Sequence, residues 1–396
     1  MFIALALIFG LIMTFFNPPF NVNDENWHFY KSYDVSQGHL IPESILSSAQ
    51  ETIGTPYWPE GPIYFNADKI IYCLNQPFNF KQTSKLDISN IAIYPPTPYL
   101  ASAFILFLGR LFNSSPLFLM YMGRLINLLI YIIIVYFAIK IIPIQKYVLL
   151  LVALMPRTIL AASSLSADSF NIAISLLTIS FILNLVLIKP KIIKKDLFIS
   201  ISLILVLSLS KQIYALISLL FLIIPKEKFK NPIRKTISFL TIIIPSLVTL
   251  ITWNSLFKNL YGTRIALSSQ QDNLILFLQD PSNFLFLLMK TLTSLKMLDF
   301  YMGTLILAGG SQTINFLFYS YITILVIVAV IATSKYKLSF KTKFVPLSIF
   351  LTIFLIVFFF EFITFTYPNS KFIEGVQGRY FIPVLPLFFL ISITIN

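Results

Sequence analysis

Apolar runs, several of them about 20 residues long, recur along the chain, and short polar stretches separate most of them. About 20 consecutive apolar residues is the length that an α-helix needs to cross the hydrocarbon core of a bilayer. Charged residues make up only 11% of the chain, whereas soluble domains carry about 25%. The pattern therefore predicts an all-α integral membrane protein.

Basic residues are concentrated in three short loops between the apolar runs. Residues 189–196 carry four Lys, residues 226–235 carry five Lys or Arg, and residues 334–343 carry four Lys. Loops rich in Lys and Arg usually face the cytoplasm. Membrane topology thus accounts for the net charge of +13, and no nucleic-acid partner is expected.

The stretch that follows the first apolar run is long and acidic. Residues 1–16 form the first predicted span, and residues 17–116 are predicted to be extracytoplasmic. Residues 17–97 contain four Lys and eight acidic residues, namely Asp24, Glu25, Asp34, Glu43, Glu51, Glu60, Asp68 and Asp87. Counting crossings from the cytoplasmic loop at 189–196 leaves both ends of residues 98–112 outside. We therefore expect this apolar segment to be a juxtamembrane helix in the interface.

Counting crossings between the basic loops gives about ten transmembrane helices in one polytopic domain. After the first span, we expect six spans in residues 117–257, an extracytoplasmic segment with a surface-lying helix in residues 258–312, and three spans in residues 313–396. Two of the runs, 197–209 and 212–225, are short, which predicts a hinge at Lys211. The chain stops inside an apolar run without a basic flank, which is the pattern of a truncated or degenerate copy.

In this topology, ionisable residues in or beside the spans gather in the extracytoplasmic half. Charges buried in hydrocarbon are costly, so such residues are candidates for function. The set comprises Asp24, Glu25, His28, Arg157, Asp168, Lys211, Glu361 and Arg379.

Each of these residues also has a structural interpretation. Asp24 and Glu25 could be ordinary headgroup-level acids, and Lys211 could extend its amine from a helix break toward the membrane surface. Arg379 could be an interfacial anchor. Arg124, in the middle of a span, is interpreted as a structural charge.

Known motifs narrow the chemistry. The sequence contains no phosphate-binding P-loop, dinucleotide fingerprint, HExxH or GxSxG motif, which disfavours ATP-driven transport and zinc or serine hydrolysis. Acids and bases at a lipid–water boundary suit the use of a sugar linked to a polyprenyl phosphate. A carboxylate would take the proton of the acceptor, and cations would hold the departing phosphate. One carboxylate and two or three cations would suffice for this reaction, because phosphate is already a good leaving group and needs no separate general acid.

Five sequence blocks, in this order, resemble a family of uncharacterised bacterial multi-pass membrane proteins that is filed as a domain of unknown function. The blocks are NPPFNVNDENWHFYKSYDVSQG, YPPTPYLASAFILFLGRLF with YMGRLINLLIYI, MPRTILAASSLSADSFNIAISLL, LSLSKQIYALISLLFLIIP and GVQGRYFIPVLPLFFL. The resemblance covers nearly the whole chain.

The layout of that family is similar to the GT-C superfamily of polyprenol-dependent glycosyltransferases. This resemblance implies juxtamembrane helices in the first outer loop and an acid at Asp24 or Glu25 that acts as general base or metal ligand. It also implies a second acid where Asp168 stands, with Lys211 and Arg379 placed for the lipid phosphate. The remaining candidates, which would bind the acceptor or be structural, are His28, Tyr94 and Tyr380.

The leading hypothesis is a multi-pass glycosyltransferase of the cell membrane. It would transfer a sugar from a polyprenyl-phosphate donor to a cell-envelope glycan or glycolipid on the extracytoplasmic face. In this hypothesis Asp24 is the general base, Glu25 is its partner in acceptor or metal binding and Asp168 is a second acid. The phosphate would be bound by Lys211, Arg157 and Arg379. No cofactor is required and no metal is expected, but Asp24 and Asp168 could hold a divalent ion. The alternative is non-catalytic, either a lipid-linked glycan transporter or flippase or an envelope assembly scaffold. A flippase should have a polar path across the whole bilayer, whereas these charges lie on one side.

Overall fold

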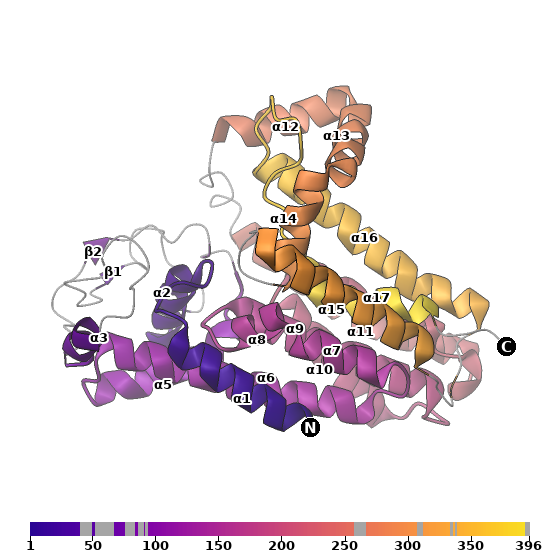
Figure 1. Cartoon of the computed structure of the whole chain (residues 1–396). Coiled ribbons are helices and arrows are strands. Elements are labelled where there is room, and N and C mark those ends of the chain that lie inside the picture. The colour runs from indigo at the N-terminus through magenta and orange to yellow at the C-terminus, as the bar shows by residue number, and fades with distance from the viewer. Residues whose placement is uncertain are drawn as a thin grey trace. The chain divides into compact units, whose positions relative to one another are not determined.

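The protein is seen in a computed structural model that describes residues 1–39, 50–51, 67–75, 84–85, 91, 94–256, 267–306, 312–332, 336 and 339–392 (Figure 1). Most of the described residues are helical, as the apolar runs predicted, and loops account for most of the rest. The strands among the described residues form a two-residue antiparallel ladder in the first loop, between β1 (Gln50–Glu51) and β2 (Ser84–Lys85). Parts of the predicted first loop, of residues 258–312 and of the last predicted span lie outside the described residues.

The chain divides into two units that interleave along the sequence. The N-terminal unit comprises residues 1–136, 158–173 and 209–211, and the C-terminal unit comprises the remaining residues. The helices that begin in the N-terminal unit are α1 (Phe2–Phe16), α2 (Glu25–Ser36), α3 (Ala67–Leu74), η1 (Thr97–Tyr99), α5 (Leu100–Leu111), α6 (Pro116–Ile141) and α9 (Ala167–Leu187). Helix α8 (Pro156–Ala162) enters this unit from the other one.

Most of the remaining helices belong to the C-terminal unit. They are α7 (Lys146–Leu154), α10 (Lys194–Ser208), η2 (Gln212–Ile223), η3 (Lys226–Lys228), α11 (Pro232–Leu256), α12 (Leu267–Gln279), α13 (Pro281–Thr293), α14 (Leu295–Ile306), α15 (Gln312–Ile331), α16 (Phe340–Thr364), η5 (Gly378–Val384), α17 (Leu385–Phe389) and η6 (Leu390–Ser392).

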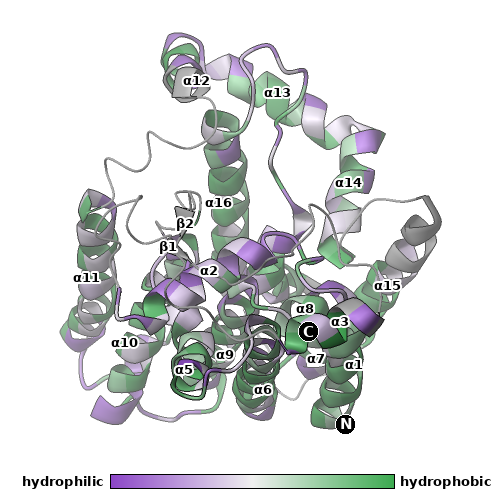
Figure 2. Ribbon diagram, turned by 90° about the vertical axis from the view of Figure 1, so that its left-hand side faces the viewer, coloured by the Kyte–Doolittle hydropathy of each residue, from purple (hydrophilic) through white to green (hydrophobic). Residues whose placement is uncertain are grey.

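Four of the described helices are long and apolar enough to cross a membrane. They are α6, α9, α11 and most of α16, from Thr342 to Thr364. Figure 2 shows apolar residues along α6, α11 and α16, whereas α2 carries many polar ones. Shorter apolar helices include α1 and η2. The total of ten crossings stays a prediction.

Two predicted spans are not continuous α-helices. One of the six spans expected in residues 117–257 is the apolar run at 147–163, which is broken where Met155 leaves the helical conformation and Pro156 starts α8. The run at 212–225 is the 3₁₀ helix η2, which follows a break after Ser208, at the expected hinge. Because a 3₁₀ helix rises about 2.0 Å per residue and an α-helix about 1.5 Å, the 12 residues of η2 reach about as far as the 15 of α10.

In the N-terminal unit, two helices pack against successive parts of α6. A Cβ added at Gly109 of α5 or at Gly10 of α1 would overlap the side chain of Leu119 or Leu128, respectively. Small residues at these points let the helices approach closely. Helix α5, which occupies the stretch expected to be juxtamembrane, also packs on α2. Its place at the membrane surface stays a prediction.

In the C-terminal unit, η5 packs directly on the backbone of α14. A Cβ added at Gly378 would lie 2.1 Å from the carbonyl oxygen of Tyr301. The Gly378 N–H also donates to Thr304 Oγ1 at 2.8 Å. The glycine of the GRYF block therefore lets two backbones come together, which a larger residue would prevent.

Candidate functional site

The first polar feature of the N-terminal unit is a buried ion pair between Glu25 and Arg124. Both side chains are fully buried. The guanidinium donates from Nε to Glu25 Oε1 at 2.8 Å and from Nη2 to Glu25 Oε2 at 2.6 Å. This two-pronged geometry is the strongest form of an Arg–carboxylate contact.

The remaining donors of Arg124 close the end of α1. Nη1 donates to the carbonyls of Thr14 (2.9 Å) and Asn17 (2.8 Å), and Nη2 also donates to that of Pro18 at 3.0 Å. The last carbonyls of a helix have no partner inside it and carry negative partial charge. Arg124 thus uses all five of its N–H groups, and it fixes the direction in which the chain leaves α1.

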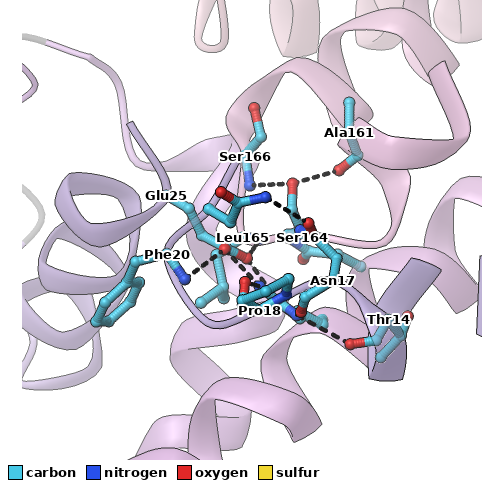
Figure 3. Close-up of polar contacts among 12 residues, drawn as sticks. Thr14, Asn17, Pro18, Phe20, Glu25, Ala161, Ser164, Leu165 and Ser166 are labelled. Atoms are coloured by element: carbon cyan, nitrogen blue, oxygen red, sulfur yellow. Dashed lines mark hydrogen bonds and ion pairs between the residues drawn. The ribbon is translucent and has the colours of Figure 1, made fainter. Parts of the chain in front are cut away.

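The carboxylate of Glu25 also holds two backbone segments. Oε2 accepts from the Phe20 N–H at 3.1 Å and Oε1 from the Leu165 N–H at 3.2 Å (Figure 3). With the two bonds from Arg124, each oxygen accepts twice, which is the full capacity of a carboxylate. Glu25 therefore helps to hold the scaffold together, and the acceptor- or metal-binding role expected from the sequence stays a prediction.

The next segment of this scaffold is the serine-rich turn between α8 and α9. Asn127 Nδ2 donates to the Ser164 carbonyl at 3.0 Å, and the Ser164 and Ser166 hydroxyls bond within the turn. Figure 3 shows the turn beside the carboxylate of Glu25. This arrangement fixes the position at which α9 begins, and therefore that of Asp168 in its first turn.

Asp24 immediately precedes Glu25 but differs from it in exposure and in backbone conformation. It is exposed and has a left-handed backbone (φ 64°). It stands at the N-cap of α2, but its carboxylate makes no capping hydrogen bond. An N-cap Asp usually uses its side chain to bind the first N–H groups of the helix. Here the backbone is left-handed and the side chain does not cap the helix.

His28, one turn into α2, is buried and contacts Tyr99 of η1. The distance between His28 Nδ1 and the Tyr99 hydroxyl is 2.8 Å. Tyr99 is 0% exposed. Burial is the main cause that raises the pKa of Tyr99 well above its usual value, and electrostatic interactions with Tyr94, Asp168 and Asp24 add to it. Tyr99 therefore keeps its proton.

The same electrostatic effect places two predicted acids around one hydroxyl. Asp24 follows the first apolar helix and Asp168 begins α9, 144 positions later by number, yet both act on Tyr99. Tyr94, expected to bind the acceptor or to be structural, belongs to the same group. The fold therefore brings Asp24, Tyr94 and Asp168 near enough to influence the charge of Tyr99 electrostatically, and it brings His28 into direct contact with the Tyr99 hydroxyl.

Lys211 belongs to the same unit as these acids. The buried hydroxyl of its neighbour Ser210 donates to Asn171 Oδ1. Asn171 lies in α9, about one turn after Asp168. This bond ties the break between α10 and η2, where Lys211 stands, to the first turns of α9.

The other predicted phosphate ligands belong to the C-terminal unit. Arg157 and Arg379 are both buried, with exposed fractions of 3% and 6%. Tyr380, next to Arg379, lies over the guanidinium and accepts a hydrogen bond at its carbonyl from the Tyr214 hydroxyl at 2.8 Å. The roles predicted for Arg157, Arg379 and Tyr380 stay predictions.

Sequence reasoning missed Tyr99, the centre of this group. The residue stands in the block YPPTPYL, after three prolines and before an apolar run, and resembles an ordinary interfacial aromatic residue. Pro98 at the start of η1 was the available signal, because proline favours the first turn of a helix. Among the described residues, no group of three or more His, Cys, Asp or Glu side chains could hold a metal ion.

Four of the described helices are apolar and long enough to cross a bilayer, so the protein is a multi-pass membrane protein. A buried ion pair joins distant segments of the chain within it. More particularly, the chain belongs to the family described as predicted membrane protein (DUF2142), whose model matches residues 7–388. No curated protein and no solved structure matches it.

Proposed function

We propose that the protein is a membrane glycosyltransferase of GT-C type that uses a polyprenyl-phosphate sugar as donor. The acceptor would be a glycan or glycolipid of the cell envelope, on the extracytoplasmic side. The observation that carries the proposal is the grouping of Asp24 and Asp168 around Tyr99, in the unit that also contains Lys211.

The proposed reaction is a displacement at the anomeric carbon of the donor sugar. The acceptor oxygen forms a new bond to this carbon as the bond from carbon to the phosphate oxygen breaks, and the phosphate leaves with the electron pair. Asp24 accepts the proton of the acceptor hydroxyl. Lys211 balances the charge of the departing polyprenyl phosphate, so that no separate general acid is needed.

The contacts of each acid support this division of roles. Asp24 is exposed and does not cap its helix, so its carboxylate is accessible to an acceptor from solution. Glu25 has its full complement of protein donors and holds the segment on which Asp24 stands. Asp168 is partly buried and would orient the acceptor, because a second carboxylate can accept hydrogen bonds from sugar hydroxyls.

The direct test is to incubate the purified full-length chain with a panel of polyprenyl-phosphate sugars and measure donor consumption. We expect Asp24→Asn to reduce transfer by about 10²–10⁴-fold, the range for loss of a general base. Asp272→Asn, which alters an exposed acid of α12, is the matched control and should keep full transfer. The melting temperature in detergent should be the same for all three proteins.

Two outcomes would contradict the proposal. Full transfer by Asp24→Asn would remove the assigned base. Failure of the unaltered chain to consume any donor of the panel would favour the non-catalytic alternative, a lipid-linked glycan transporter or a scaffold.

A further inference from the structure

The contact between His28 and Tyr99 determines which nitrogen of the histidine ring carries a proton. A neutral imidazole has one N–H donor and one acceptor nitrogen, and its partners decide which is which. At 2.8 Å, either His28 Nδ1–H donates to the tyrosine oxygen or the tyrosine O–H donates to Nδ1.

The surroundings of Tyr99 distinguish these two arrangements. The tyrosine is 0% exposed, so its hydroxyl proton has no access to water. Among the described residues, the only partner of this hydroxyl is His28 Nδ1. If Nδ1 carried a proton, the O–H of Tyr99 would be a buried donor without an acceptor, which costs about 1–3 kcal/mol.

We infer that His28 is held as the neutral tautomer with its proton on Nε2, and that Tyr99 is the positioning residue that fixes this state. The Tyr99 hydroxyl donates to Nδ1, which leaves Nε2–H as the donor of the ring. His28 therefore cannot serve as the resting general base through Nε2, because that nitrogen has no free lone pair.

The inference gives His28 a defined task in the proposed reaction, and in this respect it rests on the proposed function. In that reaction the Nε2–H group would act as a hydrogen-bond donor to an oxygen, either of the donor phosphate or of a sugar hydroxyl. Asp24 alone would accept the proton. In the segment DENWH, Asp24 would thus act as the proton acceptor and His28 as a hydrogen-bond donor.

The tautomer can be measured without any substrate. The chain contains only two histidines, so ¹⁵N-histidine labelling of the His39→Gln variant leaves the His28 ring as the single labelled imidazole. In detergent near neutral pH, we expect Nδ1 to resonate as an unprotonated nitrogen and Nε2 as a protonated one. A protonated Nδ1, with or without a proton on Nε2, would overturn the inference.

Removal of the hydroxyl tests the part that Tyr99 plays. In Tyr99→Phe on the same His39→Gln background, the two nitrogen signals should move toward the average of exchanging tautomers. Tyr33→Phe, the same change at another buried tyrosine of the α2–α5 core, should leave them unchanged. An unaltered spectrum in a folded Tyr99→Phe protein would show that Tyr99 does not fix the ring. If that variant does not fold, the nitrogen shifts of the His39→Gln protein still decide the tautomer.

A second pair of variants tests the use of His28 once transfer has been detected. Gln places an amide N–H near the position of Nε2, whereas Asn places one near Nδ1. We expect His28→Gln to retain more of the transfer activity than His28→Asn. Equal loss in both would contradict the donor role while leaving the tautomer result intact, and a panel without any transfer would count only against the proposed function.

Discussion

Glu25 and Asp24 are neighbours in the sequence, but Glu25 is buried and Asp24 is exposed. This difference supports the separate roles that we propose for them. The carboxylate of Glu25 joins Arg124, the loop after α1 and the turn before α9. A buried charge of this kind is tolerated only when it is paired and fully hydrogen-bonded. The exposed carboxylate of Asp24 has no such task in helix capping.

Breaking the buried pair should be strongly destabilising. Glu25→Gln leaves the Arg124 guanidinium buried without its counter-charge, and such changes cost about 3–5 kcal/mol. We expect a large fall in the melting temperature in detergent. Glu227→Gln, at an exposed acid in a basic loop, is the control and should change little. A Glu25→Gln protein as stable as the parent would show that the pair does not hold the fold.

Lys31 should make the stability of the chain depend on pH. It is fully buried in α2, 4.0 Å from Asp34, which accepts a hydrogen bond from His39. Burial lowers the pKa of Lys31 from 10.5 to about 8, against the opposing charge of Asp34. Between these two values the unfolded chain binds more protons than the folded one, so stability should rise with pH across this window.

The measurement is thermal unfolding in detergent at pH 8 and pH 10. We expect Lys31→Met to lose the part of the pH dependence that belongs to Lys31, on the order of 3 kcal/mol over the full window. Lys371→Met, at an exposed lysine, should retain the parental slope. Identical slopes for the parent and Lys31→Met would contradict the assignment.

At the scale of elements, hydropathy predicted where helices occur better than which kind they are. The helix at α5 and the break at residues 209–211 followed from apolar length and from the position of Lys211. The 3₁₀ form of η2 could not be predicted, because a run of apolar residues is compatible with both an α-helix and a 3₁₀ helix. The break at Met155 had a signal in Pro156, since proline suits the first position of a new helix.

The candidate site could be predicted only in part for a related reason. The types and positions of Asp24, His28 and Asp168 marked them as candidates, and the fold groups them around Tyr99. The sequence did not separate Asp24 from Glu25, because their difference depends on Arg124 and on backbone N–H groups that are distant in the chain. It also could not assign the arginines to one unit or the other.

The GRYF block gives a prediction at the scale of elements. Because a Cβ at Gly378 would overlap the Tyr301 carbonyl and α14 cannot move its backbone at low cost, Gly378→Ala should destabilise the protein by at least about 1–3 kcal/mol. Gly10→Ala meets only the flexible end of Leu128 and should cost less. Denaturant titration in detergent compares the two, and an equal effect would contradict the close approach.

At the scale of the whole molecule, the proposed site joins distant segments of the chain and opens on one face of the membrane. Asp24 and Asp168 come from different helices of one unit, and the basic loops predict that both lie on the extracytoplasmic side. Proximity and sidedness are separate claims, but one chemical experiment can address both in intact cells.

That experiment places cysteines at positions 24 and 168 in a chain whose single cysteine, Cys73, has been replaced by serine. A short, membrane-impermeant bifunctional thiol-reactive reagent is then added outside intact cells, and the two single-cysteine variants, at position 24 and at position 168, are the controls. We expect an intramolecular cross-link in the double variant only. Absence of this cross-link, or its appearance only after the membrane has been permeabilised, would contradict a shared extracytoplasmic site.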